Sequence, residues 1–380
     1  MLAIKPGDNI MGVTGMPPEL PGDRVKQLMV ERRWSQAELA YVLGTTTATV
    51  NQVVNSKRPI TPEMAKLLGV AFDRPAEEFA DLQARWSLSQ AAEPDEEVRA
   101  RARAQSDFPL REMVKRGWIN DPKDGGSAHG ELCRFFGVNT LDSVPSLAHA
   151  AKKTGSDGPT GEQLAWLYRV RAIASEMPTP AYTKAKLQDA IDRMSAMRLS
   201  PEEIRHVPRL LHEAGVRFVA VEGLPGGRID GVCTWLDSDS PVIGMSLRFD
   251  RIDNFWFVLR HECAHVMHGH GKSVAIIDSD LSMSDDETDE DEIIANKEAA
   301  DFCVSAEKMR SFYVRKNPFF SESDVKSFAK INGVHPGLVV GQLQHMTKEY
   351  RNLRQYLVNV RKFITSSAMT DGWGNFVPVN

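Results

Sequence analysis

The stretch "FWFVLRHECAHVMHGHG", Phe255 to Gly271, decides what the second half of the chain is expected to be. It contains His261-Glu262-Cys263-Ala264-His265, in which the two histidines are four positions apart. Residues four apart share one face of a helix, so both imidazoles can reach one metal ion. The preceding "DRIDNFWFVLR", with Asp253 as its expected N-cap, predicts that helix.

The residues around the two histidines predict a hydrolytic zinc site. Glu262 lies just off their line, where it can take a proton from a zinc-bound water and pass it to a leaving amine. A catalytic zinc site also needs a third protein ligand. The segment Glu292 to Val304 reads as a helix, and within it Glu298 is the expected third ligand, with Glu292 the weaker candidate. Asp301 is expected to hold a histidine ligand through its second ring nitrogen.

Other reactive side chains nearby have two interpretations each. His268 and His270 are expected to face solvent at the helix end, or else to form a ligand set with the second histidine of the motif. Cys263 is expected to pack in the core, or else to act as an inhibiting or sensing thiolate. His335 and His345 are expected to be surface or packing residues, or else to stabilise an oxyanion.

Length and composition limit the class of protein. A chain of 380 residues is long enough for two or three domains, and 42% hydrophobic with 26% charged residues is typical of a globular protein. The net charge of -5 excludes nucleic-acid binding by bulk charge, but it allows one small basic domain. The four cysteines form no CxxC pair, so neither a disulfide framework nor a zinc ribbon is indicated.

The N-terminus has no apolar signal segment, and no apolar run reaches membrane-spanning length, so we expect a cytoplasmic protein without membrane contact. The expected fold class is multidomain, mainly α followed by α+β. "VRFVAVEGL", "DGVCTWLD" and "SPVIGMSLR" predict three strands, the last two joined by a hairpin turn. The expected parts are a flexible N-terminus over 1–20, a helical domain over 21–88, a linker over 89–109, a helical middle over 110–200, and a sheet-containing domain over 201–380.

An acidic run precedes the expected ligand helix. Nine acidic residues lie between Asp278 and Glu292. The run predicts a solvated, mobile loop. The alternative is a regulatory segment that mimics a basic-site ligand or gates the nearby cleft.

The first domain has the local signals of a helix-turn-helix. Ser35 and Glu38 predict a capping box at the start of one helix, and Gly44 supplies the left-handed turn after it. The next helix would bury Val50, Val53 and Val54. Helix, glycine-containing turn and helix is the arrangement in which the second helix enters the major groove of DNA.

Polar and basic residues are placed where this interface needs them. Between Arg24 and Arg58 there are six basic residues against two acidic ones, as phosphate neutralisation requires. We expect operator binding to depend on Asn51 and Arg58, and we expect a homodimer that reads paired half-sites. The candidate DNA contacts are Gln36, Thr46, Thr47, Asn51, Gln52, Lys57 and Arg58.

Residues 20–90, with "SQAELAYVLGTTTATVNQVVNSKRPITPEMAKLLGVAF", resemble the Xre/Cro-type helix-turn-helix of HigA-like antitoxins. The resemblance implies a dimeric, operator-binding repressor of its own operon. It also implies that Thr46, Thr47 and Asn51 lie on the reading helix.

Residues 200–350, with "RHECAHVMHGHG", "KEAADFCV" and "INGVHPGLVVGQLQH", resemble the ImmA/IrrE family of zinc metallopeptidase domains. The resemblance implies that His261, His265 and Glu298 bind Zn²⁺, with Glu262 as catalytic base. It implies cleavage of repressors or antitoxin-like DNA-binding proteins. The sequence departs from that family at Asn296, where a second acid is usual, and in its long acidic insertion.

The two halves together predict a transcriptional regulator that carries a zinc metallopeptidase-like domain, with a cognate toxin or another protein as its possible substrate. The alternative is a repressor or antitoxin whose C-terminal domain is a non-catalytic sensor or partner-binding module. Glu262 favours the enzyme, because a purely structural zinc site would not need it.

Overall fold

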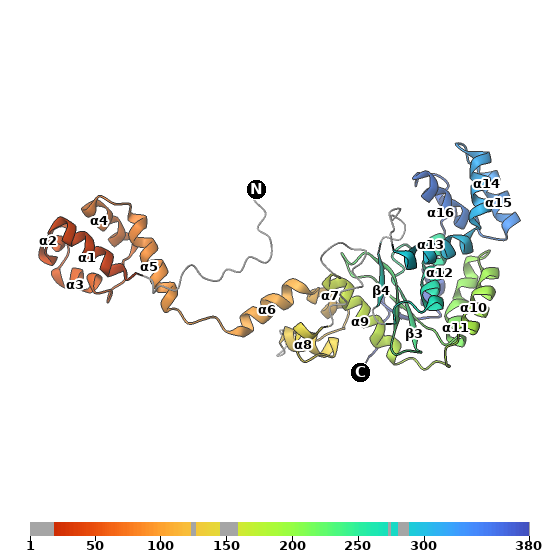
Figure 1. Ribbon diagram of the computed structural model, residues 1–380, viewed down its shortest axis with the longest axis horizontal. Helices are drawn as coiled ribbons and strands as arrows, with labels where there is room; N and C mark the ends of the chain where they lie inside the picture. Colours follow the sequence, from red (N-terminus) through yellow and green to blue (C-terminus); the bar gives the residue numbers. More distant parts are fainter. Residues whose placement is uncertain (1–18, 123–126, 145–158, 273–274, 280–288, 380) are drawn as a thin grey trace. The chain divides into compact units, whose positions relative to one another are not determined.

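The computed structural model describes residues 19–122, 127–144, 159–272, 275–279 and 289–379. The chain divides into two compact units, Met1–Asp95 and Glu96–Asn380 (Figure 1). Each unit has a hydrophobic core of its own, with a single cluster in the first and two clusters in the second. In the part of the chain that the structure describes, no helix is both long and apolar enough to cross a bilayer.

The first unit is built from helices only. Ser35 caps the second helix and forms the expected capping box with Glu38, and Gly44 has a φ of +62°. Val50, Val53 and Val54 are buried in the core of the unit, as predicted. The helices are α1 (Pro21–Arg32), α2 (Gln36–Val42), α3 (Thr47–Val54), α4 (Pro62–Phe72) and α5 (Ala76–Gln90).

The segment over 89–109, which was expected to be a linker, is largely helical. A helix, α6 (Glu96–Asp107), occupies most of that range. Its Ala104 is fully buried in a core cluster of the second unit. Ala104 and the packing of α6 against α8 attach this polar, charged helix to the second unit. Residues 91–95 are left between α5 and α6.

The second unit combines a five-stranded sheet with helices. The three strands expected from sequence are β1, β2 and β3, whereas β4 and β5 were not predicted. The strands are β1 (Arg217–Val221), β2 (Ile229–Trp235), β3 (Pro241–Met245), β4 (Ile276–Ser279) and β5 (Met369–Asp371). The α-helices are α7 (Leu110–Lys115), α8 (Ala128–Phe136), α9 (Gly161–Ser175), α10 (Lys184–Met197), α11 (Val207–Glu213), α12 (Ile252–His268), α13 (Glu290–Cys303), α14 (Ala306–Lys316), α15 (Glu322–Asn332), α16 (Pro336–Thr347) and α17 (Arg361–Thr365). Short 3-10 helices are η2 (Leu141–Ser143), η4 (Pro201–His206) and η5 (Arg354–Tyr356).

The sheet has the strand order β4-β2-β3-β1-β5, so β4 and β5 are its edges. β2 pairs antiparallel with β3, which confirms the predicted hairpin, and also antiparallel with β4. β1 pairs parallel with β3 and with β5. The sheet is therefore mixed, and the strand that carries part of the acidic run forms one of its edges.

Helices cover both faces of the sheet (Figure 1). Phe218 and Ala220 of β1 belong to the core that contains α12, whereas Val219 and Val221 belong to the core that contains α9. Alternate residues of a strand point to opposite faces, so burial on both faces explains why β1 is apolar from Phe218 to Val221. α9, which lies in the range 110–200 that was expected to be helical, packs directly against β1.

A glycine on β2 makes room for the acid of the HExxH motif. A Cβ added to Gly231 would lie 2.1 Å from Oε1 of Glu262 and 2.9 Å from Cγ1 of Val258. Both atoms belong to α12, and Glu262 is fully buried. The absence of a side chain at Gly231 therefore lets α12 approach the sheet with the Glu262 carboxylate between them.

We predict that Gly231→Ala destabilises the protein by about 1–3 kcal/mol, because the new methyl group overpacks this contact. Gly223→Ala is the matched control, since its added Cβ would meet only Ser246 at 3.7 Å, and we expect its effect to stay within about 0.5 kcal/mol. Urea denaturation of both variants measures the difference. Equal stability of the two variants would contradict the close approach of α12 to β2.

Candidate functional site

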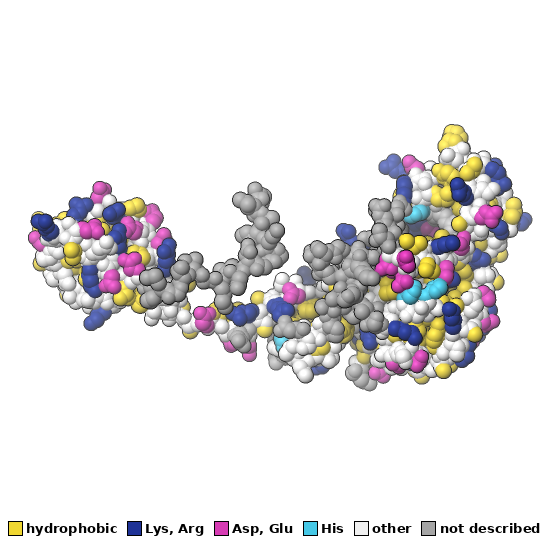
Figure 2. All heavy atoms as spheres, viewed as in Figure 1, with side chains coloured by type: hydrophobic (Ala, Val, Ile, Leu, Met, Phe, Trp, Pro, Cys, Tyr) yellow, Lys and Arg dark blue, Asp and Glu magenta, His cyan; other side chains and the backbone are white. Residues whose placement is uncertain are grey.

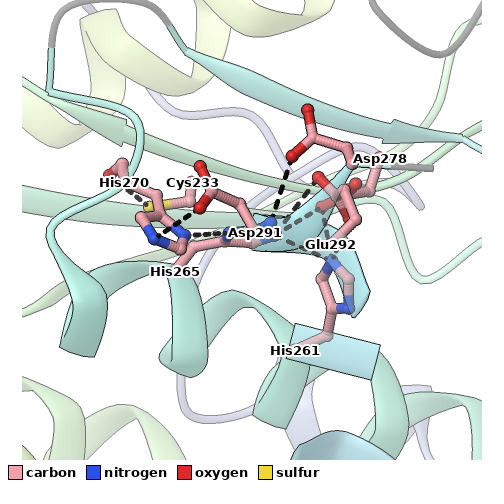
Figure 3. Close-up of polar contacts among 8 residues, drawn as sticks. Cys233, His261, His265, His270, Asp278, Asp291 and Glu292 are labelled. Carbon is pink, nitrogen blue, oxygen red and sulfur yellow. Dashed lines mark hydrogen bonds and ion pairs between the residues drawn. The ribbon is translucent and has the colours of Figure 1, made fainter. Parts of the chain in front are cut away.

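Four side chains from three elements meet beneath the surface of the second unit (Figure 3). They are His261 and His265 of α12, Asp278 of β4 and Glu292 in the first turn of α13. One ligand atom from each lies within 4.8 Å of all the others. The exposed fraction of Glu292 is 4%, and the other three residues are completely buried.

The nitrogens and oxygens of this group converge on one point. Nε2 of His261 lies 2.9 Å from Nε2 of His265, and it lies 3.2 Å from one oxygen of Asp278 and 3.2 Å from one oxygen of Glu292. Nε2 of His265 lies 3.5 Å from Glu292 and 3.9 Å from Asp278. We call these four residues the metal-ligand group.

The group has a negative electrostatic field. Burial lowers the pKa of the His261 imidazole, but the charges and hydrogen bonds of Asp278 and Glu292 outweigh burial and raise it to about 9. Burial and the charge of Asp278 raise the pKa of Glu292, whereas hydrogen bonds from His261 and His265 bring it down to about 2. Buried carboxylates need a compensating positive charge, which a proton on His261 or a bound cation can supply.

The donor set fits a divalent cation. Two imidazole nitrogens and two carboxylate oxygens are ligands that Zn²⁺ accepts in four-coordinate sites, and other divalent metals bind the same atom types. The negative charge of Asp278 and Glu292 attracts a proton to His261, and the same charge would attract a metal ion to the group. The structure therefore contains a candidate metal site, and the residues leave the identity of the ion open.

Glu298, the expected third ligand, does not lie in this group. Its carboxylate accepts a hydrogen bond from Nη2 of Arg260 at 2.7 Å and pairs with Nε2 of His268 at 2.9 Å. Glu292 and Glu298 are six residues apart on α13, which rotates them by about 240° around the helix axis, so the two cannot point to the same site. Glu292, the weaker candidate for the third ligand, lies in the group instead of Glu298.

The other ring nitrogen of His265 belongs to a chain of hydrogen bonds. Nδ1 of His265 lies 3.0 Å from Nδ1 of His270, and Nε2 of His270 lies 3.2 Å from Oδ1 of Asp291. Burial lowers the pKa of His270, and the charge of Asp291 opposes this shift without cancelling it. This chain connects His265 to Asp291 and orients the His265 imidazole, whose Nε2 is directed at the group.

His261 is held in a different way. Its Nδ1 is buried and has no hydrogen-bond partner among the described residues. The ring instead stacks on Phe257, with 6.3 Å between the ring centroids. Asp301, which was expected to hold a histidine ligand, accepts a hydrogen bond from the backbone N–H of Ala306 at 2.8 Å. Aromatic packing on Phe257 therefore orients the His261 ring, whereas hydrogen bonds through His270 orient the His265 ring.

The structure gives the surroundings of the cysteine and the histidines for which the sequence allowed both a structural and a functional role. Cys263 is fully buried, and burial raises the pKa of its thiol to about 12, so it is a core residue and not a thiolate. His268 is half-exposed beside Glu298, and histidine side chains reach the surface of the face in Figure 2. His335 caps α16 by accepting from the N–H of Gly337. His345 lines a cavity that is described below.

Asp278 was missed as a site residue because it was counted in the acidic run. Asp278 lies in β4, and Glu290 to Glu292 form the first turn of α13, while 280–288 lie outside the described residues. The segment "AIID" just before the run carried a weak strand signal. Pairing of β4 with β2, which is distant in sequence, is what buries Asp278.

A cavity of about 610 Å³ lies one helical turn from the metal-ligand group. Phe257 is four residues before His261 on α12, and Asn296 is four residues after Glu292 on α13; both line it. The volume is in the range of small-ligand sites. Other lining residues include Phe249, Met309, Arg310, Leu338 and His345.

The exposed face of α3 in the first unit carries the expected polar residues. Thr46 caps the helix by accepting from the N–H of Thr49, and Thr46, Thr47, Asn51 and Gln52 are exposed. Nδ2 of Asn51 donates to Oε1 of Gln36 at 3.0 Å. This bond joins the start of α2 to the middle of α3, so two candidate DNA contacts hold each other in place.

Lys57 and Arg58 follow α3 in a tight turn. Their backbone N–H groups donate to the carbonyl of Gln52 at 2.8 and 3.1 Å. Both side chains are exposed, and neither forms an ion pair with another described residue. Arg24 and Lys26, by contrast, are paired with Glu78 and Asp23. The basic side chains that remain open to an anionic partner therefore include the two beside α3.

Comparison with known proteins gives matches for the first unit. Residues 25–79 match the helix-turn-helix family. The HigA antitoxin of Pseudomonas aeruginosa, solved with the higBA promoter, is 35% identical over 19% of this chain and 80% of that protein, with a TM-score of 0.19. An addiction-module antidote protein of the HigA family from Coxiella burnetii is 28% identical over 19% and 80%, with a TM-score of 0.19.

Another Pseudomonas aeruginosa protein, solved in complex with an 18-bp operator DNA, is 36% identical over 21% of this chain and 89% of that protein, with a TM-score of 0.20. The matched part of the present chain contains α2, the turn at Gly44 and α3. The N-terminal unit of this chain therefore belongs to the helix-turn-helix family.

Proposed function

We propose that this protein is an operator-binding transcriptional regulator of the HigA-like antitoxin or autorepressor type, and that its second unit is a zinc metallopeptidase-like domain of the ImmA/IrrE kind. The observation that carries the proposal is the presence in one chain of a helix-turn-helix domain and a buried group of two histidines and two carboxylates.

The first unit supports DNA binding through its local chemistry. Threonine, asparagine and glutamine side chains on the outer face of α3 can donate to and accept from base edges. Lys57 and Arg58 are placed to neutralise phosphates next to that helix. The HigA protein of Pseudomonas aeruginosa, which is similar to this unit, was solved with promoter DNA. We propose that α3 reads an operator and that the protein binds it as a homodimer on paired half-sites.

The second unit supports a zinc site that serves hydrolysis of a protein partner. His261, His265 and Glu292 would hold the ion, which when bound supplies a Lewis acid for a carbonyl group and a water of lowered pKa. Glu262 is a nearby acid that is not one of the proposed metal ligands. It is buried on α12 against Gly231, and we assign it the transfer of a proton from the attacking water to the leaving amine. A cognate toxin or another protein is the proposed substrate.

One observation favours the alternative function. The metal-ligand group has four protein residues, and a catalytic zinc site needs an open position. A closed site would leave the second unit as a sensor or partner-binding module that does not cut peptides. Whether the site is open, as in a peptidase, or closed, as in a sensor, depends on whether Asp278 is a ligand.

We predict that Asn51→Ala weakens binding to a duplex from upstream of the gene that encodes this protein by about 1–3 kcal/mol, because a base contact is lost. Arg58→Ala should weaken binding and reduce the slope of affinity against salt by about one. Fluorescence anisotropy at several salt concentrations measures both effects. Lys66→Ala, an exposed lysine of α4, is the control for removing one charge elsewhere. Affinity retained by the Asn51→Ala, Arg58→Ala double variant would refute operator reading by α3.

We predict that purified protein carries about one zinc ion per chain, because the group offers a single four-residue site. Glu292→Ala should lose the metal by removing a ligand. Glu298→Ala should keep it, because Glu298 binds Arg260 and His268 instead. Mass spectrometry of metal content gives the answer. Loss of zinc in Glu298→Ala with retention in Glu292→Ala would reverse the assignment.

We predict that Glu262→Gln lowers cleavage of the protein encoded by the neighbouring operon gene by about 10²–10⁴-fold, because the proton-transfer group is removed. The zinc content should stay unchanged, since Glu262 is not in the metal-ligand group. Electrophoresis of timed digests follows the cleavage, and Glu307→Gln, at an exposed carboxylate of α14, serves as the control. Cleavage at the wild-type rate by Glu262→Gln would exclude Glu262 as the base.

A further inference from the structure

Asp278 adds a fourth potential ligand atom to the two histidines and Glu292. Its carboxylate oxygen lies 3.2 Å from Nε2 of His261 and 3.9 Å from Nε2 of His265, close to the distances for Glu292. Its side chain is completely buried, so it belongs to the interior of the site and is not a surface acid. With Asp278 included, the chain itself provides four ligand atoms.

Four protein ligands close a tetrahedral site, whereas catalytic zinc sites have three and keep the fourth for water or substrate. We propose that Asp278 is a displaceable fourth ligand that closes the metal site, so that this structure represents the latent state of the second unit. The inference rests on the proposed metal site. It adds that the site must release Asp278 before a water or a peptide carbonyl can enter.

The four ligands differ in the elements that carry them. His261 and His265 belong to α12, a helix of 17 residues, and Glu292 belongs to α13, a helix of 14 residues. These two helices pack against each other and are tied by the Arg260–Glu298 ion pair at 2.7 Å. Three ligands are therefore fixed on one rigid support.

Asp278 lies on the least supported of these elements. β4 has four residues and is an edge strand that, among the described residues, pairs with β2 alone. The register between β2 and β4 is irregular between Ile229 and Gly231, and Gly231 is the residue that pairs with Asp278. Short edge strands with irregular pairing open at a lower free energy than helices in the core. Asp278 is thus the ligand that can leave while the other three stay.

The neighbourhood of Asp278 also contains the proposed base. Gly231 pairs with Asp278 on one side, and its missing side chain makes room for the Glu262 carboxylate. Release of Asp278 would open a coordination position on the side of β2 where Glu262 lies. β2 therefore contacts both Asp278, which would close the site, and Glu262, which would act as the base once the site is open.

The test uses full-length protein loaded with Co²⁺, whose visible absorption reports the coordination of the ion, and acetohydroxamate as a small ligand for open positions. We expect the wild-type spectrum to be insensitive to acetohydroxamate. Asp278→Ala and the near-isosteric Asp278→Asn should respond to it, with Co²⁺ affinity weakened about tenfold or more, as for loss of a supporting residue or ligand. Glu307→Gln, which changes an exposed carboxylate of α14, is the matched control and should behave as wild type.

The outcomes separate this inference from the proposed function. A wild-type spectrum that already responds to acetohydroxamate, or Asp278 variants with unchanged spectra and affinity, would overturn the closing role while leaving the metal site intact. Failure of wild-type protein to bind Co²⁺ at all would overturn the metal site itself. Circular dichroism of each variant identifies a loss of fold, and the Asp278→Asn variant keeps the test available if Asp278→Ala unfolds.

Discussion

Two carboxylates buried beside two imidazoles set the main physical constraint on the second unit. Asp278 and Glu292 bring negative charge to a place without solvent, where an uncompensated charge would cost several kcal/mol. The histidines provide the compensation, either as a protonated His261 or as neutral ligands of a cation. This requirement ties β4, α12 and α13 to one another, because each provides part of one charge-balanced group.

The rest of the fold holds that group in place. The mixed sheet is covered on both faces, and its two apolar cores keep β2 and α12 at the close distance that Gly231 allows. α13 lies along α12, with Arg260 and Glu298 linking them at the outer side. The hydrogen-bond chain through His270 and Asp291 orients one imidazole. The helix-turn-helix unit has a separate core and needs none of these contacts.

Features that depend on local sequence could be predicted, and those that depend on long-range packing could not. The capping box at Ser35, the turn at Gly44 and the pairing of His261 with His265 on one helix face each involve residues within a few positions of one another. The choice between Glu292 and Glu298 required the rotation of α13 relative to α12, which no local pattern specifies. Asp278 required the pairing of a four-residue edge strand with β2, while its neighbours in sequence indicated a loop.

The contact between Gly231 and Glu262 links two positions that lie on different elements and are separated by thirty residues of sequence. Any side chain at 231 would compete with the carboxylate for the same space, whereas metal binding by the histidines does not demand a glycine there. The two positions therefore depend on each other: a larger residue at 231 requires a smaller one at 262, and a glutamate at 262 requires a glycine at 231.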